Sequence, residues 1–153
     1  MFMFSGRVID NSKNSLTGVT VSILKDGKII KTLSTSTSGK FSAYEIPLGY
    51  VYKFIFEKPG HTKISVLIDI RKGYFPEDYE TKSRPDKKYP NVAEISDKNL
   101  VTLFKKIPNI NYSVIESKPR AKLGYDPELH FDDHYIQSRK NEIDQFLNKI
   151  EAQ

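Results

Sequence analysis

The sequence predicts a mainly β protein: a Greek-key β-sandwich of about seven strands, followed by an irregular extension and a C-terminal helix. Three observations predict it. Short apolar runs alternate with polar residues at the two-residue period of a half-buried strand. Turn residues separate these runs about every 8–12 positions. Apolar residues near the C-terminus recur at helical spacing instead.

The strands come first in the chain. Apolar and polar residues alternate over 19–23 and 64–70, and the run 51–56 is rich in aromatic residues. We expect four side chains from these runs and from the turn before residue 41 to face the sandwich interior. They are Val21, Phe41, Phe54 and Val66. Nine Tyr and nine Phe can bury a large apolar area, so a core is feasible although only 38% of the residues are hydrophobic.

Turn chemistry marks the ends of the strands. Asp26-Gly27 is the strongest short signal for a two-residue hairpin. Gly39, in the turn before Phe41, is expected to adopt a positive φ. The glycines predicted to carry structural turns are Gly6, Gly18, Gly39, Gly49 and Gly60.

The chain changes character after residue 71. Residues 72–96 combine Gly73 and three prolines with many charges, which predicts a long loop, and a strand is expected near 97–105. The extension 72–131 is rich in aromatic residues, unlike a disordered chain, so we expect it to be partly ordered. Some of these rings should lie against the sandwich and others against a partner. They are Tyr74, Phe75, Tyr79, Tyr89, Tyr112, Tyr125 and Phe131.

The last segment, 132–153, is predicted to be a helix. Asp132 or Asp133 can cap its N-terminus. Its apolar stripe consists of Ile136, Ile143, Leu147 and Ile150. Such a helix is marginal alone in water and needs a partner surface. The stripe therefore docks on the sandwich of its own chain or contacts another chain, and it is the candidate partner contact.

One group of residues has the chemistry of a metal site, namely Asp126, Glu128, His130, Asp132, Asp133 and His134. Pro127 favours a turn there, and the aspartates are already explained as a helix cap, so we expect no metal site. The chain has no Gly-x-Ser-x-Gly nucleophile motif and no glycine-rich phosphate loop. Without cysteine it has no thiolate nucleophile and no disulfide. We therefore expect no catalytic residue, no cofactor and no enzyme.

The charge distribution also bears on partners. The net charge is +5, and residues 1–75 carry 11 basic against 5 acidic side chains. These lysines are scattered over turns and strand edges, where they commonly prevent aggregation, so no nucleic-acid partner is expected. No apolar run reaches the roughly 20 residues of a membrane-spanning helix. A protein partner is expected, while a homo-oligomer or association with a membrane through a partner stays open.

Motifs in residues 4–70 resemble the carboxypeptidase-regulatory-like domain, a transthyretin-like β-sandwich. The opening strand Phe4–Asp10, the second strand Leu16–Val21 and the turn Thr35–Phe41 follow the family pattern in order. The Pro47–Gly49 and Lys58–Thr62 turns follow in their places. Ser36 and His61 depart from the common Asp and Tyr. The glycines carry the turns, so the resemblance still implies a non-catalytic sandwich over residues 1–71.

The rest of the chain is similar to a tail found after this domain in Bacteroidetes envelope proteins. The similarity includes Leu103–Ile115, Lys118-Pro119 and Lys122–Pro127, followed by Phe131–Tyr135 and a helix. It implies a structural or protein-binding module of the bacterial cell envelope, in the periplasm or at the outer membrane, acting as an adaptor or accessory subunit. The sequence as given begins without an export signal. The alternative is a structural component of a bacteriophage virion: a capsid decoration, fibre or tail protein.

Overall fold

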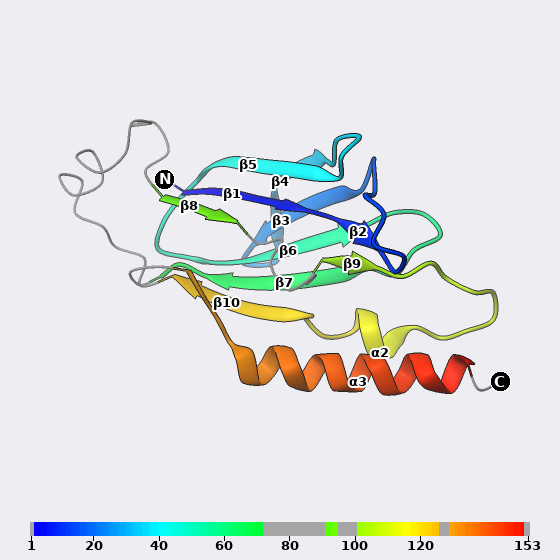
Figure 1. Cartoon of the computed structure of the whole chain (residues 1–153). Helices are drawn as coiled ribbons and strands as arrows, with labels where there is room; N and C mark the ends of the chain where they lie inside the picture. Colours follow the sequence, from blue (N-terminus) through cyan, green and yellow to red (C-terminus); the bar gives the residue numbers. More distant parts are fainter. Residues whose placement is uncertain (1, 72–90, 95–100, 126–128, 152–153) are drawn as a thin grey trace.

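The computed structural model describes residues 2–71, 91–94, 101–125 and 129–151, and its strands form a sandwich of two sheets with a helix along one side (Figure 1). The predicted fold class, a mainly-β sandwich with a C-terminal helix, is confirmed. Seven strands come from residues 2–69: β1 (Phe2–Arg7), β2 (Ile9–Asp10), β3 (Thr20–Lys25), β4 (Lys28–Ser34), β5 (Lys40–Ile46), β6 (Val51–Glu57) and β7 (Ile64–Asp69).

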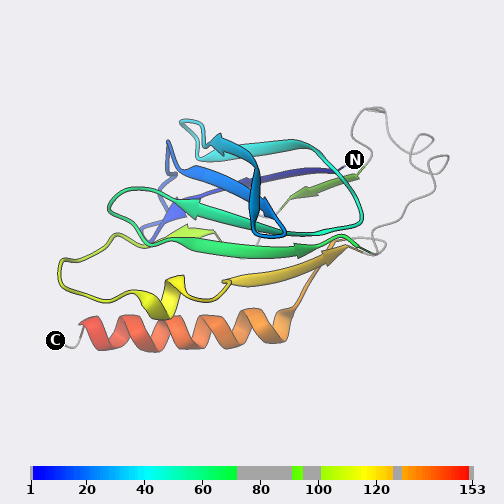
Figure 2. The same cartoon turned by 180° about the vertical axis from the view of Figure 1, so that it is seen from behind.

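The later part of the chain adds strands and two helices. They are β8 (Asn91–Glu94), β9 (Thr102–Leu103), α2 (Ser113–Glu116), β10 (Ala121–Tyr125), β11 (Leu129–Phe131) and α3 (Asp133–Glu151). The smaller sheet has the order β5-β1-β8, and the larger has the order β11-β10-β7-β6-β3-β4. A third, two-stranded sheet pairs β2 with β9. Figure 2 shows from behind how α3 runs beside β10 along the side of the sandwich.

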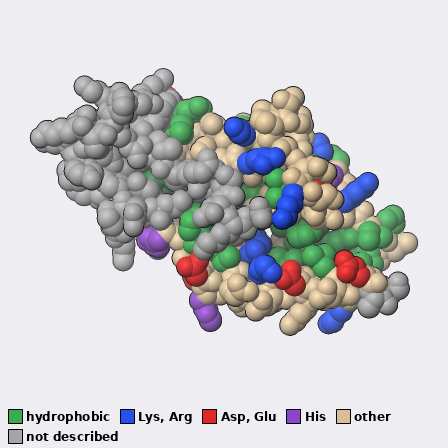
Figure 3. Space-filling view, in the orientation of Figure 1, with side chains coloured by type: hydrophobic (Ala, Val, Ile, Leu, Met, Phe, Trp, Pro, Cys, Tyr) green, Lys and Arg blue, Asp and Glu red, His purple; other side chains and the backbone are tan. Residues whose placement is uncertain are grey.

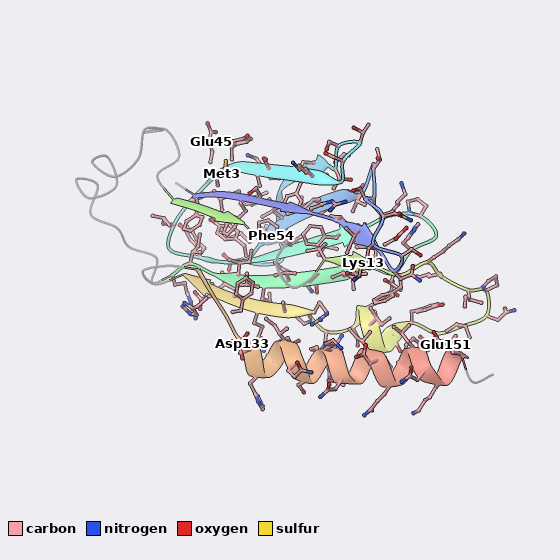
Figure 4. The ribbon with its side chains drawn as sticks, in the orientation of Figure 1. Met3, Lys13, Glu45, Phe54, Asp133 and Glu151 are labelled. Carbon is pink, nitrogen blue, oxygen red and sulfur yellow. The ribbon has the colours of Figure 1, made fainter. Side chains whose placement is uncertain are left out.

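The core lies between the two main sheets. Val21, Phe41, Phe54 and Val66 are all buried, with at most 3% of any of them exposed, which confirms the predicted inward side chains. Phe54 packs edge-on against Phe4 of the facing sheet, with ring centroids 5.2 Å apart, and Figure 4 shows it between the layers. Alternation at period two thus places the aromatic residues of β1 and β6 against each other.

The extension after residue 71 is built into the sandwich. Strand β8 pairs in parallel with β1, and β10 pairs in parallel with β7. Without these two pairings, β1 and β7 would be edge strands of their sheets. The strand expected near 97–105 is β9, which begins at Thr102, while residues 97–100 lie outside the described residues. The predicted loop over 72–90 also lies outside them. Residues 113–116 form α2, and Ile115 of this helix is buried in the core.

Helix α3 begins where the sequence predicts. Asp132 is the N-cap: its carboxylate accepts a hydrogen bond from the Tyr135 amide at 3.1 Å, and its carbonyl accepts one from the Ile136 amide at 2.9 Å. Ile136 and Ile143 face the chain's own core, 7% and 3% exposed. The N-terminal half of the apolar stripe therefore docks on the sandwich of its own chain, which is the first of the two alternatives.

Arg139 fastens the helix to the segment before β10. Its guanidinium is 1% exposed and donates to the carbonyls of Pro119 at 3.0 Å, Val114 at 2.9 Å and Ile115 at 3.1 Å. The Tyr135 hydroxyl donates to the same Pro119 carbonyl at 2.5 Å. A cation that satisfies several carbonyls at once orients α3 firmly against this segment.

Four of the five predicted turn glycines have a positive φ, namely Gly18, Gly39, Gly49 and Gly60. Gly6 differs: it lies inside β1, opposite Phe41, and is a strand residue rather than a turn residue. The alternation of buried and less buried residues along β1 continues through Gly6, so this glycine belongs to the strand and not to a turn. Among the described residues, no helix combines the length and apolar character needed to cross a membrane.

Candidate protein-binding surfaces

The apolar stripe of α3 divides into a buried and a partly exposed half. Because Ile136 and Ile143 are buried in this chain, the expectation that they contact a partner is corrected. Leu147 and Ile150, nearer the C-terminus, are partly buried and pack at the border of the core. For these two residues, contact with a partner stays a prediction.

Leu147 and Ile150 line an apolar groove of about 310 Å³ between the end of α3 and the loop after β9. Figure 3 shows hydrophobic side chains gathered at this end of the molecule. We call this surface the helix groove. Its lining residues are Asn11, Phe104, Lys105, Ile107, Tyr112, Leu147, Ile150 and Glu151.

Tyr112 forms the floor of the helix groove and holds its two walls together. The Tyr112 hydroxyl accepts a hydrogen bond from the Ile107 amide at 2.9 Å, which fixes the loop. The Tyr112 ring meets the Phe146 ring edge-on, at a centroid distance of 5.7 Å, which fixes the helix. Ile107 is 54% exposed above this fixed floor, so a preformed apolar contact is available to a partner.

Two charged residues, Lys105 and Glu151, are among those that line the groove. Figure 4 shows Glu151 at the C-terminal end of α3. Lys106 and Glu116, whose charged groups lie 3.2 Å apart, line a separate pocket. An apolar floor with a charged rim is the composition found at protein–protein contacts.

A second exposed surface lies at the other side of the larger sheet, along β4. No residue of β4 is buried, and Ile29 and Ile30 are 62% and 43% exposed. The β3–β4 hairpin turns at Asp26-Gly27, where both residues have a positive φ, as the hairpin signal predicts. Two consecutive isoleucines directly after the turn were a sequence signal for this exposure, because adjacent strand residues cannot both face the core.

The histidine and carboxylate residues do not form a metal site in the described part of the chain, where no three such side chains come together. His130 lies in β11 and His134 in α3, so they do not share a helical face. Asp126 and Glu128 lie outside the described residues. The His130 ring packs over Gly124 of β10, where an added Cβ would come within 2.6 Å of the ring.

His130 also lines a shallow groove of about 510 Å³ on the outer face of the larger sheet. Arg71 and Asp69 in this groove pair with each other at 2.7 Å. Val51 and Leu67 give the groove an apolar floor, and Lys122 and Asp132 add one charge of each sign. The arrangement has neither a uniform charge nor a nucleophile held by a base, so it does not indicate a reaction.

Comparison with known proteins finds remote structural likenesses and leaves the activity open. No family model matches the chain, and no curated protein matches it. Among solved structures, 5-hydroxyisourate hydrolase of Klebsiella pneumoniae is 22% identical, over 36% of this chain and 56% of that one, with a TM-score of 0.34.

Other solved structures that resemble the chain are aromatic-ring dioxygenases. Catechol 1,2-dioxygenase of Acinetobacter radioresistens is 15% identical, over 77% of this chain and 56% of that one, with a TM-score of 0.46. 3-Chlorocatechol 1,2-dioxygenase of Rhodococcus opacus 1CP is 15% identical, over 69% and 60%, with a TM-score of 0.42. The chain spans little more than half of these proteins, and likenesses this remote carry no argument about its activity.

Proposed function

We propose that the protein is a non-enzymatic structural or protein-binding module of the bacterial cell envelope, of the carboxypeptidase-regulatory-like class, acting as an adaptor or accessory subunit. The observation that carries the proposal is the helix groove, where Ile107 is 54% exposed above a fixed apolar floor. Apolar groups held in place at the surface favour binding, because little conformational entropy is lost when a partner covers them.

Further support comes from the way the groove is built. The Tyr112 hydrogen bond and the Tyr112–Phe146 contact hold both walls without a partner. Leu147 and Ile150 belong to the stripe in which the sequence predicts a contact. The envelope location, periplasmic or at the outer membrane, rests on the resemblance of the tail to Bacteroidetes envelope proteins.

Photo-crosslinking in the producing bacterium tests this proposal. A benzoylphenylalanine at position 107 lies in the groove, and the same residue at the exposed position 137 on α3 is the matched control. We expect a discrete protein adduct in the envelope fraction from position 107 and none from position 137. Equal adducts at both positions, or none at 107, contradict the proposal. An adduct to a phage structural protein in infected cells places the module in a virion instead.

A further inference from the structure

The geometry points to the free edge of β4 as a second binding surface, which accepts an extended acidic segment of another protein as an added strand. The larger sheet ends at β4, and within the described residues this strand pairs with β3 and with no other strand. The outer side of an edge strand presents backbone N–H and C=O groups in the spacing that another strand needs.

Apolar exposure accompanies this edge. The register moves from Ile23 opposite Lys31 to Leu24 opposite Ile29, so Ile30 has no counterpart on β3. This bulge leaves Ile29 and Ile30 62% and 43% exposed, side by side at the edge. An added strand would cover them with its own apolar side chains, as cross-strand pairs do elsewhere in a sheet.

The charge of the edge selects the kind of strand. Lys28 lies directly opposite Lys25 in the β3–β4 register, a like-charge pair that destabilises a sheet. Lys31 lies on the same strand and donates to the Tyr44 carbonyl of β5 at 2.5 Å. Strand β4 itself has no acidic residue. Carboxylates on an added strand would compensate these lysines, whereas a basic strand would be repelled.

A second copy of this chain fits the edge less well than an acidic strand. In an antiparallel pair of two β4 strands, the register that sets Ile29 opposite Ile30 also sets Lys28 opposite Lys31. Like charges at those positions oppose the pairing. In this register the lysines oppose a second copy of the strand and attract a strand of opposite charge.

Two blocked nine-residue peptides test the proposal, one alternating glutamate with valine and the other alternating lysine with valine. Each is titrated into the full chain labelled with ¹⁵N, and amide shifts are followed. We expect the glutamate peptide to shift the amides of β4 and the lysine peptide to leave them unchanged. The Lys28→Glu variant should weaken binding of the glutamate peptide by about tenfold or more, because one attraction becomes a repulsion.

Two further variants make the result specific. The Ile29→Ser/Ile30→Ser double variant should lose the β4 shifts, whereas Ile107→Ser, at a position 54% exposed in the helix groove, should keep them. Equal binding of both peptides, or shifts confined to the helix groove, overturns the proposal. A concentration-dependent dimer in sedimentation that Ile30→Ser abolishes also overturns it, in favour of a second copy. None of these outcomes affects the crosslink at position 107, so the two proposals fail separately.

Discussion

At the scale of single residues, Arg139 shows how a charged side chain replaces apolar packing at the centre of a contact. Its side chain is 1% exposed, yet the carboxylate of Glu142, with which it pairs, lies 3.4 Å away and is 44% exposed. The burial is tolerated because the backbone carbonyls of residues 114, 115, 118 and 119 accept its hydrogen bonds. The cation serves as a structural joint between α3 and the α2 segment.

We expect Arg139→Ala to lower the free energy of unfolding by about 3 kcal/mol or more, since it leaves several carbonyls unsatisfied. Lys140→Ala is the matched control. Lys140 forms an exposed ion pair with Asp144 at 2.7 Å, and its loss should cost less than about 1 kcal/mol. Urea denaturation of both variants measures the difference. Equal stability of the two variants would contradict the structural role.

Tyr52 gives a pH prediction. Its ring is fully buried, its hydroxyl donates to the Pro47 carbonyl at 2.6 Å, and burial, with Tyr50 nearby, raises the pKa of Tyr52 from 10.0 to about 12. The folded chain thus holds this proton more tightly than the unfolded chain. The resulting stabilisation is complete below pH 10 and is lost as the pH rises through about 12.

Between these two pH values, the unfolding free energy should fall more steeply for the natural chain than for Tyr52→Phe, by up to about 1.4 kcal/mol per pH unit. The slopes are compared, because Tyr52→Phe also loses a hydrogen bond worth about 1 kcal/mol at neutral pH. Identical slopes for the natural chain and Tyr52→Phe would exclude Tyr52 as the titrating group.

At the scale of elements, the turn before β5 depends on one glycine. Gly39 has φ +74°, and a Cβ there would lie 2.6 Å from the Val8 carbonyl oxygen. The Val8 amide also donates to the Gly39 carbonyl at 2.8 Å, so the two backbones cannot move apart without losing a hydrogen bond. Gly60 has a similar φ of +80° but open space around it.

Gly39→Ala should therefore destabilise the chain by at least about 2 kcal/mol, the sum of left-handed strain and a backbone clash. Gly60→Ala carries the strain alone and should cost about 1 kcal/mol. Thermal unfolding of the two variants measures the difference. If Gly60→Ala costs as much as Gly39→Ala, strain alone limits both turns, and the contact with Val8 is unimportant.

The elements differ in how far the sequence predicts them. Strands β3, β6 and β7 and helix α3 follow from local periodicity, and the Asp132 cap follows from residue type. Strand β10 lies in a run that alternates only briefly, and its parallel pairing with β7 depends on residues more than 50 positions away. Local patterns do not contain that pairing, because it is decided by which edge of the sheet is free.

The helix groove was predictable only in part, for a related reason. The stripe from Ile136 to Ile150 indicates an apolar helix face, but the sequence does not reveal where along the stripe the chain's own core ends. That boundary depends on Arg139 and Tyr112, whose roles come from tertiary contacts. The positions of α2 and of the loop after β9 determine which half of the stripe stays partly exposed.

At the scale of the whole molecule, the position of α3 separates folding from binding. The sequence leaves open whether the helix docks on its own sandwich or on another chain, but Ile136, Arg139 and Ile143 are buried against the rest of the chain. A chain ending at residue 131 should therefore lose at least about 4 kcal/mol of stability, from the two isoleucines alone. It should also bind a hydrophobic dye through the surface that α3 covers.

A chain ending at residue 146 makes the matched comparison, since it keeps Ile136, Arg139 and Ile143 but removes Leu147 and Ile150 from the groove. We expect its denaturation midpoint to stay close to that of the full chain, while the crosslink from position 107 disappears. If the chain ending at 131 is as stable as the full chain, α3 is not part of the fold. If the chain ending at 146 keeps the crosslink, the partner rests on Ile107 and Phe104 rather than on the helix.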